Sequence, residues 1–215
     1  MSNYSQFVDL LSKYCASYKL KTAIEEPLSK TSVDTASEHG NRCFNSKIKD
    51  LKTISMDNIA QDIIRKICFC DSCKDDESPA SVDSFLIDKN GIWYFIEFKN
   101  QKIKNTKSKC VEKSYANIYW LLKILHDMKD KGVSISFDYE HPLQFIKEKC
   151  RFVLVIGDGC DDLTFNKIRE AEKANLELPE SCLFLKKLEA YIFNKASVYR
   201  ETEFDAKFIK YFEYI

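Results

Sequence analysis

The spacing of apolar residues along the chain predicts several amphipathic helices. In these segments apolar side chains recur every three or four residues, so they gather on one side of a helix. Phe7, Leu11 and Tyr14, near the start of the chain, have this spacing. The predicted helices are 2–20, 56–66, 107–129, 164–176 and a last one from about 202 to 211.

Runs of apolar residues predict strands between these helices. The run at 152–156 is uninterrupted, which suits a strand that is covered on both faces. Segment 23–48 has little periodicity, so it is either a linker or a loop-rich crossing with a short helix around Glu38. The other predicted strands are 82–87, 92–99, 183–185 and 190–199, with 67–70 as a further short candidate. This order predicts an α/β fold, a central mixed β-sheet flanked by helices on both faces.

The length and composition of the chain suit one generous domain. Its 215 residues are 45% hydrophobic and include 15 Phe and 11 Tyr, enough for a large core. We expect residues 1–55 to form a helical and loop segment that packs on a core of residues 56–215. Together the two parts are expected to form one compact domain.

The strands 82–87 and 92–99 are predicted to pair as a hairpin. They are separated by Asp88-Lys89-Asn90-Gly91, a strong turn signal. A three-residue loop of 89–91 places the glycine at the left-handed position that this loop class favours. That register pairs Asp88 with Ile92, and therefore sets Asp83 directly opposite Glu97. A loop one residue longer or shorter would turn Asp83 to the other face of the sheet.

Alternation along the two strands sorts their side chains onto two faces. One face carries Phe85, Ile87, Trp93 and Phe95, with Asp83, Glu97 and Lys99 at its far end. The other face carries Val82, Leu86, Ile92, Tyr94, Ile96 and Phe98. Because both faces are apolar, the hairpin is expected inside a sheet covered on both sides. Two buried carboxylates are costly, and a divalent cation offsets both their desolvation and their repulsion.

Charge and cysteine usage exclude several classes of protein. The 33 basic and 33 acidic residues cancel, so binding to nucleic acid would depend on a local patch. No segment approaches about 18 uncharged apolar residues, so we expect no contact with a membrane. The start of the chain lacks the pattern of a signal peptide. The chain has nine cysteines, an odd number, so they cannot all pair in disulfides. We therefore expect a cytoplasmic protein with reduced thiols.

The hairpin residues carry a resemblance to a known family. Pro79-Ala-Ser-Val-Asp83 followed by Glu97-Phe98-Lys99 resembles the signature of the PD-(D/E)XK nuclease superfamily. The strand 93–100 also resembles that of uncharacterised bacterial proteins with an I/V-E-F-K-N run. The resemblance covers about residues 57–156 and implies a restriction-endonuclease-like sheet. Here the proline and aspartate are separated rather than adjacent. The family's sheet also needs a strand before Asp83, for which 67–70 is the available segment.

The resemblance implies roles for particular residues. Asp83, Glu97 and the Phe98 backbone carbonyl would bind Mg²⁺ or Mn²⁺. Lys99 would orient or polarise the attacking water and stabilise negative charge in the transition state. The family often adds an acid from the helix before the hairpin, for which Glu38 is the candidate and Asp62 a weaker one. It also often adds a Gln or Lys after the hairpin. Gln101 and Lys113 are the candidates for that role.

Two further clusters bear on ligands. Four lysines after the hairpin are candidates for gripping a nucleic-acid backbone: Lys102, Lys104, Lys107 and Lys109. The motif Cys68-x-Cys70-x-x-Cys73, with Cys43 or His39 as a fourth ligand, resembles a zinc site. It lacks a second cysteine or histidine pair downstream, so we expect no zinc.

Taken together, the sequence predicts a Mg²⁺-dependent nuclease, with DNA favoured over RNA as the substrate. Defence, repair and toxin roles all stay open. A homodimer is possible, since a simple double-strand cut needs two active sites. The alternative is an inactive binding or immunity module on the same fold, because members of this superfamily have lost activity.

Overall fold

The computed structural model describes residues 2–34, 42–43, 51–64, 80–135 and 140–212. A mixed sheet of six strands, in the order β1-β4-β5-β6-β7-β8, forms its centre. The strands are β1 (Glu25–Pro27), β4 (Lys52–Ile54), β5 (Ser84–Ile87), β6 (Trp93–Lys99), β7 (Cys150–Ile156) and β8 (Lys195–Arg200). The pairs from β1 to β6 are antiparallel, and β6, β7 and β8 are parallel. A separate small pair is formed by β2 (Val33–Asp34) and β3 (Arg42–Cys43).

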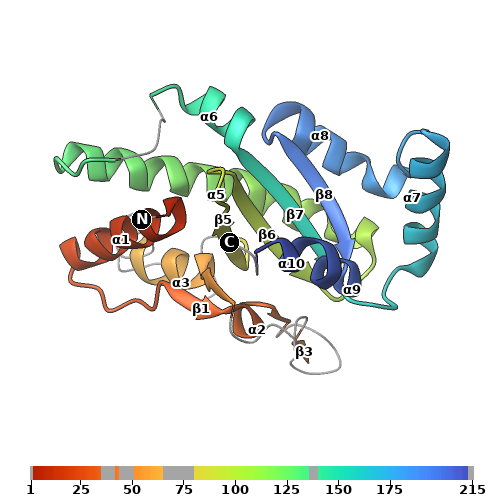
Figure 1. Ribbon diagram of the computed structural model, residues 1–215, viewed down its shortest axis with the longest axis horizontal. Helices are drawn as coiled ribbons and strands as arrows, with labels where there is room; N and C mark the ends of the chain where they lie inside the picture. The colour runs from red at the N-terminus through yellow and green to blue at the C-terminus, as the bar shows by residue number, and fades with distance from the viewer. Residues whose placement is uncertain (1, 35–41, 44–50, 65–79, 136–139, 213–215) are drawn as a thin grey trace.

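Helices cover both faces of this sheet, as the sequence predicted (Figure 1). The longer ones are α1 (Asn3–Ser17), α5 (Ile103–Asp130), α6 (Pro142–Lys149), α7 (Asp162–Ala174) and α8 (Leu183–Tyr191). The short ones are α2 (Leu28–Thr31), α3 (Met56–Ile59), η1 (Ala60–Ile64), η2 (Glu180–Cys182), α9 (Glu201–Glu203), η3 (Phe204–Ile209) and α10 (Lys210–Phe212). In Figure 1, α5 crosses behind the sheet, while α9 and α10 lie in front of it.

The hairpin has the predicted register. Ile87 pairs with Trp93, and Ser84 pairs with Ile96. The Asp88 N–H donates to the Ile92 carbonyl at 2.9 Å, so 89–91 form the loop. Gly91 has a φ of 71°, in the left-handed region that residues with a side chain rarely adopt. One step beyond the Ser84 pair, the same register sets Asp83 opposite Glu97.

Two apolar cores lie on the two faces of the sheet. The larger one contains Phe85, Trp93 and Phe95, on which α1 packs with the Phe7 ring 4.7 Å from the Trp93 ring. The smaller one contains Leu86, Tyr94, Ile96 and Phe98, covered mainly by the C-terminal helices. The predicted sorting of faces is therefore confirmed apart from one residue. Val82 packs into the larger core because it precedes β5 and is not held by strand alternation.

The strand predicted at 183–185 is wrong, because these residues begin α8. Phe184, Leu185 and Leu188 are buried together, at a spacing that only a helix places on one side. The strand predicted at 190–199 is right only in its second half, where β8 begins at Lys195. Three apolar residues in a row fit a strand or a buried helix turn equally well, so the short run was ambiguous.

The strand that pairs with β5 on its outer side is β4, in which Ile54 pairs with Phe85. Segment 67–70, nominated for this place, lies outside the described residues. Only three residues form β4, too few for a clear period-two pattern in the sequence. Because β1 and β4 belong to the same sheet as the hairpin, residues before position 55 supply two of its strands.

Candidate functional site

Four charged side chains meet at the carboxyl end of β6. Asp83 precedes β5, Glu97 and Lys99 lie on β6, and Lys113 comes from α5. The Lys113 Nζ lies 3.2 Å from Asp83 Oδ1 and 2.7 Å from Glu97 Oε1. Lys99 forms a close ion pair with Glu97 on the same strand. We call these four residues the acid–lysine cluster.

Asp83 is fixed by the backbone of β6. Its Oδ2 accepts a hydrogen bond from the Phe98 N–H at 2.7 Å. Since β5 begins only at Ser84, the carboxylate takes the place that a longer strand would fill with a backbone carbonyl. The N–H and C=O of one strand residue point to the same side, so the Phe98 carbonyl also faces the Asp83 side.

Burial dominates the electrostatics of Glu97, which has no exposed surface. Burial, and then the Asp83 carboxylate, raise the pKa of Glu97 from 4.5 to about 7, although Lys113 and Lys99 oppose this. Burial lowers the pKa of Lys113, but the attraction of Glu97 and Asp83 is larger, and the net shift is upward. The pKa of Lys99 is raised by the same balance. The two lysines therefore stay charged while Glu97 titrates near neutral pH.

Asp57 is a further acid near the cluster, and the sequence analysis missed it. It lies in the first turn of α3, which begins at the N-cap Ser55. Its Oδ1 accepts a hydrogen bond from the Ser81 hydroxyl. Burial and then the Asp83 carboxylate raise the pKa of Asp57, while Lys113 and Lys99 lower it. It therefore shares the field of the acid–lysine cluster.

The signal for Asp57 was present in the sequence. The resemblance implies an acid from the helix before the hairpin, and the predicted helix 56–66 contains both Asp57 and Asp62. Asp62 was nominated from it, but its carboxylate is exposed and accepts a hydrogen bond from Thr22 at 3.2 Å. No hydrogen bond or ion pair joins it to the acid–lysine cluster in the described part of the chain. Glu38, the preferred candidate, lies outside the described residues.

Lys113 is the nominated helix residue that the structure brings to the acids. Gln101, nominated with it, is exposed beyond the end of β6 at Lys99, where strand alternation no longer directs its side chain. In the described part of the chain Gln101 makes no hydrogen bond to the cluster. Lys113 lies on the 28-residue α5, which contacts β6 of the hairpin.

The four lysines nominated for nucleic acid lie at the start of α5, and all are exposed: Lys102, Lys104, Lys107 and Lys109. Lys109 is one helical turn before Lys113, so it projects on the same side of α5. Lys104 is about two and a half turns before Lys113 and projects on the opposite side. Lys109 also pairs with Glu112 at 2.9 Å, an exposed pair.

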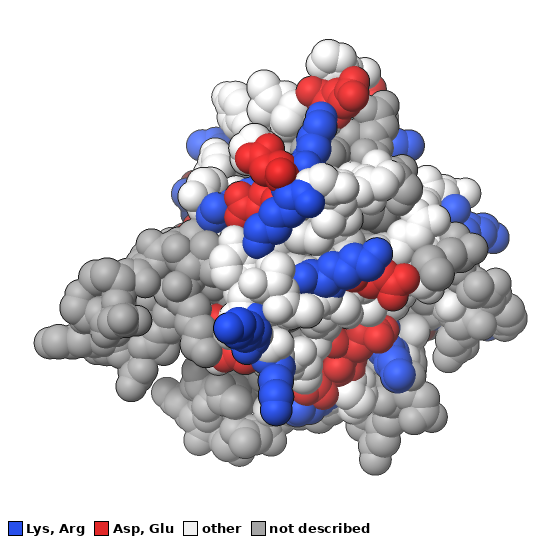
Figure 2. Space-filling view, turned by 90° about the vertical axis from the view of Figure 1, so that its left-hand side faces the viewer, with Lys and Arg blue, Asp and Glu red and all other residues white. Residues whose placement is uncertain are grey.

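On one face of the molecule the charges are mixed. Figure 2 shows one face of the molecule, on which basic and acidic side chains alternate rather than gather by sign. This agrees with the balance of 33 basic and 33 acidic residues. Binding of nucleic acid would therefore depend on a local basic group, such as the one at the start of α5.

The carboxylate oxygens of the cluster suit a hard divalent cation. In this structure the Lys113 ammonium pairs with both carboxylates. Asp83 and Glu97 supply carboxylate oxygens, the ligands that Mg²⁺ and Mn²⁺ prefer. The Glu97 Oε1 is buried and accepts no hydrogen bond of good geometry from a described residue, its contacts with Lys99 and Lys113 being ion pairs. Over the described residues, no three His, Cys, Asp or Glu side chains form a ready metal group. Binding of a cation between Asp83 and Glu97 therefore requires that the Lys113 side chain move away from them.

No side chain of the proposed zinc motif belongs to the described part of the chain. Cys68, Cys70, Cys73 and His39 lie outside the described residues, and the side chain of Cys43 does as well. Cys110, which is described, is buried beside the cluster, and burial followed by the Glu97 charge raises the pKa of its thiol.

Comparison with known proteins yields no match: no family model, no curated protein and no solved structure is similar enough to report. Fold and site therefore define only a class, an α/β protein with a buried cluster of acids and lysines at the end of a central strand. In the residues that the structure describes, no helix is long and apolar enough to cross a membrane.

Proposed function

We propose that the chain is a Mg²⁺- or Mn²⁺-dependent nuclease whose site is the acid–lysine cluster. The observation that carries this proposal is the meeting of Asp83, Glu97 and Lys99 at the end of a buried strand pair. Such a group is costly to bury, and a binding role for a cation explains why it is there. DNA is the favoured substrate, following the resemblance to the PD-(D/E)XK superfamily.

Each residue has a part in the proposed chemistry. Asp83 and Glu97, with the Phe98 carbonyl beside them, would hold the cation, which supplies activation of water and polarisation of the phosphate. Lys99 keeps its charge next to Glu97, where it would stabilise the negative charge that develops on the phosphate. Lys113 holds the two acids together before the cation binds.

The test of this function is metal binding followed by cleavage. Millimolar Mn²⁺ is expected to raise the melting temperature of the wild type but not of the Asp83→Ala/Glu97→Ala double variant. Cation binding needs ionised Glu97, whose pKa is about 7, so binding releases a proton. Below pH 7 the affinity should fall by up to about tenfold per pH unit, and it should level off above pH 8. Titration calorimetry across this range measures both effects.

Equal shifts in the wild type and the double variant would contradict the metal site. The protein would then be better explained as an inactive binding or immunity module. One observation favours that second candidate: Lys99 and Lys113 already neutralise Asp83 and Glu97 without a cation. Cleavage of DNA and RNA, each single- and double-stranded, separates the two candidates directly.

The lysines of α5 give a second prediction. Lys109→Gln should weaken binding of DNA to the Glu97→Gln protein, because Lys109 projects on the side of the cluster. Loss of one phosphate contact should lower the slope of log affinity against log salt concentration by about one. Fluorescence anisotropy at several salt concentrations measures this slope. Lys104→Gln, on the opposite side of the same helix, is the matched control, and a larger effect in it would place DNA elsewhere.

A further inference from the structure

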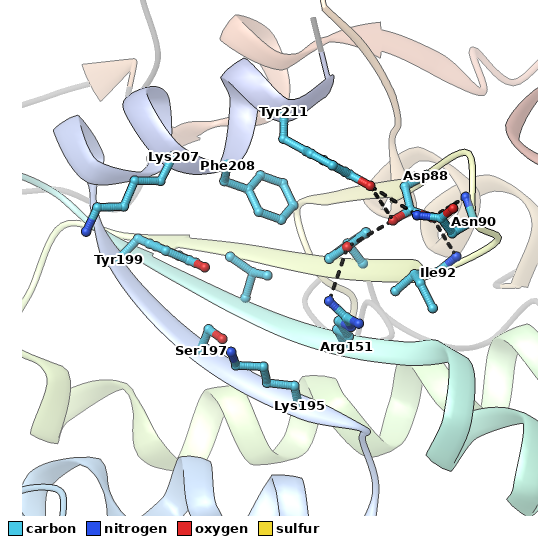
Figure 3. Close-up of a pocket in the computed structure, with 12 residues that line it drawn as sticks. Asp88, Asn90, Ile92, Arg151, Lys195, Ser197, Tyr199, Lys207, Phe208 and Tyr211 are labelled. Carbon is cyan, nitrogen blue, oxygen red and sulfur yellow. Dashed lines mark hydrogen bonds between the residues drawn. The ribbon is translucent and has the colours of Figure 1, made fainter. Parts of the chain in front are cut away.

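A second charged cavity lies on the other face of the sheet. Its volume is about 350 Å³, and β6, β7 and β8 form its floor. Figure 3 shows Phe208 and Tyr211 projecting into it from the C-terminal helical segment, opposite Ser197 and Tyr199 on the sheet. The Tyr94 side chain in its floor is on the opposite face from Glu97 and three residues away, about 10 Å along the strand. The cavity is therefore separate from the acid–lysine cluster.

The cavity has an excess of positive charge. Among the described residues that line it, Arg151, Lys195 and Lys207 are cations and Asp88 is the one carboxylate. Both carboxylate oxygens of Asp88 already accept hydrogen bonds, from the hairpin and from Tyr211. Its Oδ1 accepts from two backbone N–H groups of the loop, at 2.8 and 2.9 Å. Its Oδ2 accepts from the hydroxyls of Tyr94 and Tyr211, at 3.2 and 3.3 Å.

Arg151 has a donor that no described residue uses. One Nη donates to the Tyr94 hydroxyl at a long 3.4 Å, as drawn in Figure 3. Its Nε is buried and has no hydrogen-bond partner within the described residues. Buried donors of this kind are normally paired, and a guanidinium pairs best with the two oxygens of a phosphate or carboxylate. Together with Lys195 and Lys207, Arg151 therefore makes this cavity favourable for an anion.

Aromatic rings form another wall of the same cavity. Phe208 lies 6.2 Å from Tyr199 and 5.0 Å from Tyr94, measured between ring centroids. Planar bases stack on such rings with little dependence on sequence. A volume of about 350 Å³ is near the lower end for ligand sites, so it suits one small molecule rather than a polymer.

We propose that this cavity binds a nucleoside monophosphate. Its phosphate would lie on Arg151 and Lys195, and its base against Phe208 and Tyr199. The proposal does not depend on the nuclease function, because it uses other residues on the other face of the sheet.

Isothermal titration calorimetry with AMP, in buffer with EDTA, tests the proposal. Wild type should bind AMP with a micromolar to millimolar dissociation constant, and Arg151→Gln should bind it at least tenfold more weakly. Adenosine and inorganic phosphate, each with half of the chemistry, should both bind more weakly than AMP. Lys173→Gln, an exposed lysine on α7 outside this cavity, is the matched control and should bind AMP like the wild type.

Two more variants keep the test decisive. If Arg151→Gln does not fold, Lys195→Gln should still weaken AMP binding about threefold or more, because its side chain is exposed and its loss costs little stability. Glu97→Gln should leave AMP binding unchanged. The proposal is overturned if wild type shows no heat with millimolar AMP, or if the folded Arg151 or Lys195 variants bind like wild type. Loss of binding in Glu97→Gln would also overturn it, by moving AMP to the acid–lysine cluster.

Discussion

Glu97→Gln is expected to lower metal-dependent cleavage of DNA by about 10³-fold, the usual size for removing a central electrostatic group. Gln has the same shape but cannot carry the negative charge that a cation needs. Glu97 is fully buried beside Lys99 and Lys113, so no nearby acid can move into its place without rearranging the core. Initial rates on a labelled DNA substrate, in Mg²⁺ and in Mn²⁺, give the measurement.

The control for this variant is Asp62→Asn, which removes an exposed carboxylate from the helical segment that contains Asp57. It should cleave DNA at the wild-type rate. Circular dichroism and melting curves must show that the Glu97 variant is folded. Activity of that folded variant within about tenfold of wild type would remove Glu97 from the chemistry and favour the inactive module.

Part of this site was readable from the sequence because local chemistry fixed it. The loop Asp88-Lys89-Asn90-Gly91 has a glycine where a positive φ is needed, and this sets the register of the whole hairpin. Side-chain alternation then places Asp83 beside Glu97 and Lys99 without any long-range information. The same reasoning sorted the two faces of the sheet, apart from Val82, which lies outside the regular strand.

The rest depends on packing between distant segments, which no local pattern records. Asp57 comes near the cluster because α3 packs against β5. The sequence predicts the helix that contains Asp57, but not how this helix packs on the sheet. Lys113 was one of several lysines after the hairpin, and only the crossing of α5 over the sheet selects it. For the same reason, β4 went unnoticed: it is three residues long and is held by its neighbours rather than by its own pattern.

The contacts of Lys113 with both acids lead to a second prediction with a large expected effect, on the stability of the protein. Lys113→Met removes the ammonium that contacts both Asp83 and Glu97, leaving the two acids with Lys99 alone. Breaking a buried ion pair from one side typically costs about 3–5 kcal/mol. We therefore expect the variant to melt roughly 10 °C below wild type in EDTA. Lys109→Met, one turn earlier in an exposed pair with Glu112, should cost less than about 1 kcal/mol.

Adding Mn²⁺ to these variants decides what the cluster is for. If the acids bind a cation, Mn²⁺ takes over the charge of the missing ammonium and no longer competes with it. Lys113→Met should then recover most of its lost stability, and should bind Mn²⁺ about tenfold more tightly than wild type. If the acids and lysines are only a structural network, the variant stays destabilised at every Mn²⁺ concentration. That result, measured by melting curves at fixed pH above 8, would argue against the nuclease even before a substrate is tried.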